Sequence, residues 1–282
     1  MITILEQMLS QYDIKNIKDE ENAIKEILQE LILNALSHIG FFKDAIFCGG
    51  TALRIFYRLN RFSEDLDFSL EKPNMDFDIE IYLPKIIKSL KEYGINIEAE
   101  TKTQRSAIQS AFLKANTIEQ MIYFNTSFEI RNIRKEEKMK IKLEIDTNPP
   151  LGGTYEMKVG LLPSIYNVKI YDKETLFAGK IHSLLCRFWN NRVKGRDLYD
   201  FIFYVSRKTN INIQFLENAM KQSGHLNENE SLSLDKIKEL LRIKFNEIDY
   251  KLAKDDVTPF IPDSKEIELW DKDLFLNLVN ML

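Results

Sequence analysis

Two short patterns near residue 50 have the residue types that bind phosphate and metal ions. Gly49, Gly50 and Thr51 stand between a predicted strand and a predicted helix. Glycines let backbone N–H groups approach phosphate oxygens closely, and a helix N-terminus favours an anion. Asp65 and Asp67 are separated by one residue, so on an extended strand their side chains share one face. We therefore predict a phosphate-binding turn followed by paired carboxylates.

A third carboxylate, Asp146, ends the clearest strand pattern of the chain. Apolar and polar side chains alternate from residue 138 to residue 146, and Glu144 shares the polar face. Mg²⁺ binds through carboxylates together with substrate phosphates. Three carboxylates from two strands suit an in-line displacement, in which one ion activates the attacking hydroxyl and another stabilises the leaving oxygens. Asp65, Asp67 and Asp146 are thus predicted to hold Mg²⁺ or Mn²⁺.

Each pattern also has a purely structural interpretation. An Asp-X-Asp segment is common on exposed strand faces, and Gly-Gly is common in turns. The order of the patterns, the short interval between them and the later strand ending at Asp146 favour the functional interpretation.

Hydrophobic periodicity predicts the elements that position these residues. A helix over 22–39, a buried strand over 45–48 and a helix over 51–59 precede a strand over 64–70. Further segments are a helix over 79–93 and strands over 95–102, 107–114 and 138–146, followed by helices over 173–190, 196–206, 213–221, 232–250 and 265–282. The sequence therefore predicts an α+β fold with a mixed sheet and a C-terminal helical bundle, in two domains, 1–172 and 173–282.

Composition limits the partners. The formal net charge of −4 argues against a protein that simply coats nucleic acid, because that needs a cationic surface. Cys48 and Cys186 are far apart and lie in apolar surroundings, so we expect buried free thiols. We find no signal-peptide pattern and no apolar run near the length of about 20 residues that spans a bilayer, so we expect a soluble, cytoplasmic protein without membrane contact.

Two pairs of motifs resemble one known family. The segments GGTALR at 49–54 and RFSEDLDF at 61–68 closely resemble the AbiEii/AbiGii toxin family of bacterial nucleotidyltransferases, which belongs to the DNA polymerase β-like superfamily. Downstream, residues 177–187 and 192–200 resemble the family's helical lysine, the arginine further along that helix, and its Arg/Lys-Asp-X-X-Asp segment. The resemblance spans residues 45 to 205, and beyond residue 210 it is limited to helical character.

The resemblance implies a role for each matching residue. Metal ligands would be Asp65 and Asp67, with Asp146 the weaker candidate for a third. Phosphate and nucleotide contacts would come from Gly49, Gly50, Thr51, Ser63, Lys180 and Arg187. Asp200 or Asp197 would complete the last motif as a catalytic residue. A lysine ammonium is a compact cation suited to phosphate.

Several of these residues have structural alternatives. Lys180 has the alternative of a solvated helix lysine. Asp197 and Asp200 have the alternative of ion pairs with Arg187, Arg192 or Arg196. Arg54 and Arg61 either reach phosphate or brace the loop before Asp65.

The resemblance implies a nucleotidyltransferase that moves a nucleotide from a nucleoside triphosphate, with Mg²⁺, to an acceptor, with tRNA as a candidate. It would act as the toxin of a toxin–antitoxin or phage-defence system, restrained by a separately encoded antitoxin. Two basic stretches, 131–142 and 187–208, suit a nucleic-acid acceptor, although the aromatic residues within the second have the helical spacing of a core. Two alternatives stay open: a non-catalytic nucleotide-binding or interaction protein, and an enzyme that modifies a small molecule such as an antibiotic.

Overall fold

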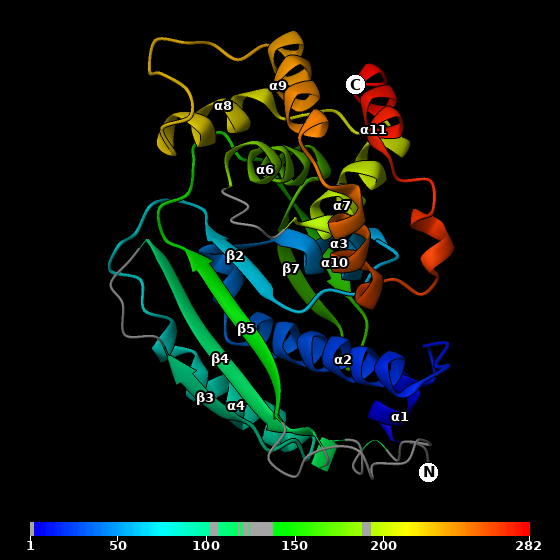
Figure 1. Cartoon of the computed structure of the whole chain (residues 1–282). Helices are drawn as coiled ribbons and strands as arrows, with labels where there is room; N and C mark the ends of the chain where they lie inside the picture. The colour runs from blue at the N-terminus through cyan, green and yellow to red at the C-terminus, as the bar shows by residue number, and fades with distance from the viewer. Residues whose placement is uncertain (1–2, 102–106, 118, 121–123, 125–137, 188–192) are drawn as a thin grey trace. The chain divides into compact units, whose positions relative to one another are not determined.

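The computed structural model describes residues 3–101, 107–117, 119–120, 124, 138–187 and 193–282 (Figure 1). The chain forms two compact units. The sheet unit comprises Met1–Phe56, Phe62–Pro149 and Met157–Ile170, and the helical unit comprises Tyr57–Arg61, Pro150–Glu156 and Tyr171–Leu282. The division into domains 1–172 and 173–282 stays a prediction. Residues 131–137 of the basic stretch predicted over 131–142, and residues 188–192 of the one over 187–208, lie outside the described residues.

A seven-stranded sheet has the order β3-β4-β5-β2-β1-β7-β6 (Figure 1). The strands are β1 (Ala45–Cys48), β2 (Leu66–Leu70), β3 (Glu98–Thr101), β4 (Ile108–Asn116), β5 (Lys138–Asp146), β6 (Tyr155–Gly160) and β7 (Tyr166–Tyr171). β1 runs antiparallel to β2 and parallel to β7, and β2 runs parallel to β5. The sheet is mixed, and the predicted α+β fold is confirmed.

In the described part of the sheet unit, the sheet is accompanied by the α-helices α1 (Ile4–Leu9), α2 (Ile17–His38), α3 (Gly49–Tyr57) and α4 (Leu83–Glu92). Short 3₁₀ helices form at Phe41–Lys43 and Ile79–Ile81. α2 begins five residues earlier than predicted, because its first turn is polar and lacks the apolar period. The signal that marks this start is Asn16, whose side chain accepts a hydrogen bond from the Asp19 amide.

The sheet unit has an aromatic core beside β1 and β2. The Phe68 ring lies 4.9 Å from that of Phe41 and 5.3 Å from that of Phe47, between ring centres, and all three side chains are buried. Burial of side chains of this size is the main stabilisation of a strand pair. The short strands on which the candidate site stands are therefore held from the opposite face.

The helical unit contains α6 (Lys173–Cys186), α7 (Gly195–Ser206), α8 (Ile213–Gln222), α9 (Leu234–Asn246), α10 (Tyr250–Val257) and α11 (Lys272–Asn280), with 3₁₀ turns at Thr258–Phe260 and Ser264–Ile267. The helix predicted over 232–250 ends at Asn246, and Asp249 caps α10 by accepting hydrogen bonds from two amides. Apolar periodicity continues across this break, which is why the sequence predicted one helix. Within the described residues, no helix is long and apolar enough to cross a membrane.

Candidate active site

α3 follows β1 directly and begins at Gly49, two residues before the helix predicted from residue 51, and this junction, the phosphate turn, requires glycine at its first position. Gly49 has a φ of +76°, in the left-handed region that side chains rarely adopt. A Cβ atom added there would also collide with the side chain of Asp67. The backbone at Gly49 therefore packs directly against one of the predicted metal ligands, and the glycine allows this close approach.

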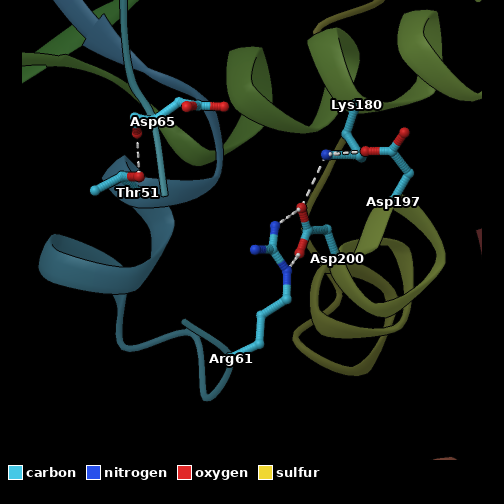
Figure 2. A network of polar contacts seen from close by, with 6 residues as sticks. All are labelled: Thr51, Arg61, Asp65, Lys180, Asp197 and Asp200. Atoms are coloured by element: carbon cyan, nitrogen blue, oxygen red, sulfur yellow. Dashed lines mark hydrogen bonds and ion pairs between the residues drawn. The ribbon is translucent and has the colours of Figure 1, made fainter. Parts of the chain in front are cut away.

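Thr51 joins this turn to the segment that contains the first aspartate. Its side chain is fully buried, and its Oγ1 donates a hydrogen bond to the backbone carbonyl of Asp65 (Figure 2). Asp65 directly precedes β2, so the strand predicted to begin at residue 64 begins two residues later. The Thr51 hydroxyl thus holds the backbone of the Asp65 segment in place, and the phosphate contact predicted for Thr51 stays a prediction.

The carboxylates of β2 and β5 share one face of the sheet. Asp67 is paired with Glu144, and Ser69 is paired with Asp146, in a parallel register. Paired residues on neighbouring strands point to the same face, and so do residues two apart on one strand. Asp67, Glu144 and Asp146 therefore lie together on what we call the acidic face. The register places Glu144, which was not a predicted ligand, directly beside Asp67.

The two carboxylates of β5, Glu144 and Asp146, have different electrostatic surroundings. Desolvation raises the pKa of the Cys48 thiol, and the charges of Asp67 and Asp146 raise it further. The charges of Asp67 and Asp146 are therefore both felt at Cys48, the last residue of β1. Glu144 instead forms an ion pair with Lys142 at 2.6 Å and accepts a hydrogen bond from the Ser110 hydroxyl at 3.4 Å. The charge of Glu144 is thus balanced locally.

Asp146 itself is destabilised as an anion. Desolvation raises its pKa, and a hydrogen bond from the Asn148 amide, 2.9 Å from Oδ1, opposes this effect only in part. Within the described residues, no three His, Cys, Asp or Glu side chains are gathered closely enough to hold a metal ion by themselves. The ligand roles of Asp65, Asp67 and Asp146 stay predictions.

The loop before Asp65 is braced from α2. The buried Gln29 side chain donates hydrogen bonds to the carbonyls of Ser63 and Glu64, at 3.0 and 2.9 Å. Arg54 donates to Glu26 at 2.8 Å, and its guanidinium lies 4.5 Å from the centre of the Phe62 ring. Arg54 was expected either to reach phosphate or to brace this loop, and these contacts show that it braces the loop. The nucleotide contact predicted for Ser63 stays a prediction.

The helical unit contains a second group of charged residues, the charged cluster, formed by Arg61, Lys180, Asp197 and Asp200. Arg61 donates two parallel hydrogen bonds to Asp200, at 2.7 and 2.6 Å, and Lys180 lies 2.5 Å from Asp197 and 2.8 Å from Asp200 (Figure 2). The side chains of Arg61 and Asp200 are 3% and 0% exposed. The Oδ2 atom of Asp197 is buried and has no hydrogen-bond partner in the structure as described.

The pKa values of Asp200 and Lys180 favour their charged forms. Desolvation alone would raise the pKa of Asp200, but Arg61 and then Lys180 lower it overall. Desolvation likewise opposes the charge of Lys180, and Asp197 and Asp200 outweigh it, so the pKa of Lys180 is raised. The cluster therefore holds two cations and two carboxylates in a buried, balanced arrangement.

Asp197 and Asp200 do form ion pairs, but the partners described are Lys180 and Arg61, whereas the sequence suggested Arg187, Arg192 or Arg196. Arg61 is 139 residues from Asp200 in the chain, a separation that no local spacing reveals. Lys180, with 14% of its side chain exposed, is not the solvated helix lysine of the structural alternative. Arg187 is exposed and ends α6, whereas Arg192 lies outside the described residues.

Comparison with solved structures places the fold in a known class. MenT4, a nucleotidyltransferase toxin of Mycobacterium tuberculosis, is 13% identical, with a TM-score of 0.52 over 98% of this chain and 90% of that one. JHP933 of Helicobacter pylori is 21% identical, with a TM-score of 0.50 over 93% and 90%. At these identities the likeness establishes the fold alone. No curated protein gave a significant match.

A sequence match over most of the chain establishes the family. A family model described as the nucleotidyl transferase AbiEii toxin of type IV toxin–antitoxin systems matches residues 31–277. The chain is therefore a nucleotidyltransferase. It belongs to the AbiEii toxin family.

Proposed function

We propose that this enzyme transfers a nucleotide from a nucleoside triphosphate to an RNA acceptor, with tRNA as the first candidate, and that Asp65, Asp67 and Asp146 bind the Mg²⁺ or Mn²⁺ that accompanies the nucleotide. The observation that carries the proposal is the close approach of the Gly49 backbone to Asp67. It brings the N-terminus of α3, the kind of helix end at which backbone N–H groups bind anions, next to the carboxylates of the acidic face.

The donor set of the acidic face fits a hard divalent cation. Asp67 and Asp146 project from adjacent parallel strands, and desolvation raises the pKa of Asp146, so a cation beside it would stabilise the anion. Mg²⁺ commonly takes one or two protein carboxylates and completes its shell with substrate phosphates and water. When bound, the ion would supply charge stabilisation at the reacting phosphate and at the leaving pyrophosphate.

Other residues have supporting parts in this proposal. Backbone N–H groups at Gly49, Gly50 and Thr51 would bind phosphate oxygens, and Ser63 would add a hydroxyl. By family resemblance Lys180 would meet the triphosphate. An ammonium has three N–H donors, and Lys180 directs two of them at Asp197 and Asp200, which leaves one for a phosphate oxygen. Membership of a type IV toxin family implies an antitoxin encoded with this chain.

The test of the proposal uses labelled substrates. The purified chain is incubated with each labelled nucleoside triphosphate in turn, with Mg²⁺, and with total RNA or an aminoglycoside mixture as acceptor. Label in a tRNA band that disappears with a chelator supports the proposal. Label on the small molecules alone would make the enzyme an antibiotic-modifying transferase. Nucleotide binding without transfer to either acceptor would favour a non-catalytic protein.

A second measurement isolates the metal. Clustered carboxylates repel one another, so we expect weak Mg²⁺ binding until a triphosphate contributes its own oxygens. Titration calorimetry of nucleotide with and without Mg²⁺ should therefore show strong coupling between the two ligands. Equal nucleotide affinity in Mg²⁺ and in chelator would contradict the metal part of the proposal.

A further inference from the structure

Exposed apolar side chains are concentrated at one strand of the sheet. Thirteen large apolar side chains are exposed in the described part of the chain, and five of them lie in β6 or in the loop between β6 and β7: Tyr155, Met157, Val159, Leu161 and Ile165. Their exposed fractions range from 44% for Tyr155 to 71% for Leu161 and Ile165. β6 forms one edge of the sheet as described, beside β7. An exposed apolar edge strand is a template for pairing with another strand.

The alternation along β6 is the reverse of the usual one. Tyr155, Met157 and Val159 point to the exposed face, whereas Glu156 and Lys158 are only half-buried. A strand at the edge of a sheet normally buries its apolar residues and exposes its charges. The exposed apolar row on β6 therefore favours an interface over a solvated surface.

We propose that β6 pairs antiparallel with β6 of a second copy of this chain, about a two-fold axis at Met157. In this register Tyr155 lies opposite Val159 of the second copy, and Glu156 lies opposite its Lys158. Aromatic side chains opposite β-branched ones, and opposite charges across strands, are the favourable cross-strand pairs. Because the two-fold repeats each contact, the segment from 155 to 159 is complementary to itself in both shape and charge.

Other registers lose this complementarity. A two-fold at Glu156 or at Lys158 would place like charges opposite each other. A two-fold at Val159 would leave Lys158 opposite Gly160. The charge pattern therefore selects the axis at Met157, and it identifies a second copy of the chain, rather than an unrelated strand, as the occupant.

The size of the contact determines how the dimer would behave. One pair of six-residue strands is small beside the roughly 1,600 Å² that a typical stable interface buries. The association is thus expected to depend on concentration, with monomer at low and dimer at high concentration. The transfer activity plays no part in this inference, which stands or falls independently of the proposed function.

Sedimentation velocity on the full chain tests the pairing. The wild-type mass should rise toward that of a dimer as concentration increases. Met157→Lys would place two ammonium groups at the axis, and we expect the association constant to fall by about 100-fold or more. Met75→Lys is the matched control, because Met75 is 63% exposed elsewhere in the chain, and it should associate like wild type. A wild type that is monomeric throughout, or unchanged association of Met157→Lys, would overturn the proposal.

Charge reversal tests the register by restoring association, and not only by abolishing it. Glu156→Lys and Lys158→Glu each place like charges opposite one another, so each variant alone should be monomeric. A mixture of the two has opposite charges at both positions and should form a heterodimer. Glu156 also accepts a hydrogen bond from the Tyr57 hydroxyl at 2.7 Å, so thermal melting of each variant checks its fold. Association in the mixture no stronger than in either variant alone would show that the register is wrong.

Discussion

The acidic face of the sheet unit and the charged cluster of the helical unit use the same residue types in opposite ways. On the acidic face, Asp67 and Asp146 are carboxylates on one face of adjacent strands, and both charges act on Cys48. In the charged cluster, Arg61 and Lys180 are set against Asp197 and Asp200 at hydrogen-bonding distance, almost wholly away from solvent. The acidic face thus gathers like charges, whereas the charged cluster pairs its carboxylates with cations.

This difference suggests that the acidic face binds a ligand, whereas the charged cluster holds the structure together. Neighbouring like charges repel one another unless a ligand of opposite charge relieves them, so they are characteristic of sites that bind cations. Balanced buried charges are already satisfied, and removing one of them leaves its partner without compensation. We therefore expect changes on the acidic face to alter catalysis, and changes in the charged cluster to alter stability first.

The largest expected stability effect comes from the charged cluster. Asp200→Ala leaves the Arg61 guanidinium buried with its two strongest hydrogen bonds lost, and the free energy of unfolding should fall by about 3–5 kcal/mol. Urea unfolding followed by circular dichroism measures it. Asp255→Ala, at an exposed position of α10, is the control and should stay within about 0.5 kcal/mol of wild type. Equal stability of the two variants would remove the distinction between the regions.

A smaller effect is expected at the phosphate turn. Gly49→Ala introduces a side chain at a φ of +76° and against Asp67, and strain of this kind costs about 1–3 kcal/mol. Gly179→Ala is the matched control: it lies inside α6, where an added Cβ meets nothing within 4 Å, so it should stabilise by about 0.5–1 kcal/mol. Unfolding measurements that show the same sign for both substitutions would contradict the turn geometry.

Glu30 on α2 extends the comparison, because it is a half-buried carboxylate beside another carboxylate, Glu26, that already has a cationic partner. Glu30 is one turn from Glu26 on α2, and Arg54 pairs with Glu26. Desolvation and then the Glu26 charge raise the pKa of Glu30 to about 8, from an ordinary value of 4.5. Between these two values the folded state binds one proton more than the unfolded state, so stability falls as pH rises through this window.

The expected loss is about 2 kcal/mol between about pH 6 and about pH 7.5, since one proton corresponds to roughly 1.4 kcal/mol per pH unit. Glu30→Gln removes the titrating carboxyl group, so the free energy of unfolding, measured with urea at the two pH values, should depend less on pH. Glu239→Gln, at an exposed position of α9, should keep the wild-type dependence. A Glu30→Gln protein that loses stability as steeply as wild type would show that another group titrates.

Local chemistry made part of this site predictable. The alternation up to Asp146 depends on neighbours in the chain, and β5 spans the predicted residues 138–146. The strand after the Gly-Gly-Thr segment was also expected, but β2 begins at Leu66 and leaves Asp65 outside it, and the helix begins at Gly49 instead of Thr51. The register between β2 and β5 depends on strands 77 residues apart, so the sequence could not show that Glu144 is paired with Asp67. The Arg61–Asp200 pair was hidden for the same reason.

The edge strand β6 was missed for a different reason. Residues 155–160 alternate, but their apolar residues face outward and their polar residues are half-buried, so no apolar buried face identified them. Pro149, Pro150 and two glycines just before them indicated the end of a strand and not the approach to another. The structure adds β6 and β7, and with them the self-complementary edge.

Transfer rates of Asp67→Asn and Glu144→Gln, measured side by side with labelled nucleotide and RNA, test the central claim most directly. The two residues are paired on one face, and both substitutions remove one negative charge and keep the volume. We predict that Asp67→Asn lowers the rate by about 1,000-fold, on the order of 4 kcal/mol in the transition state, with the melting temperature preserved. Glu144→Gln, whose charge Lys142 already balances, should stay within about threefold of wild type. Full activity of Asp67→Asn, or equal losses in both, would contradict the assignment of catalysis to Asp67.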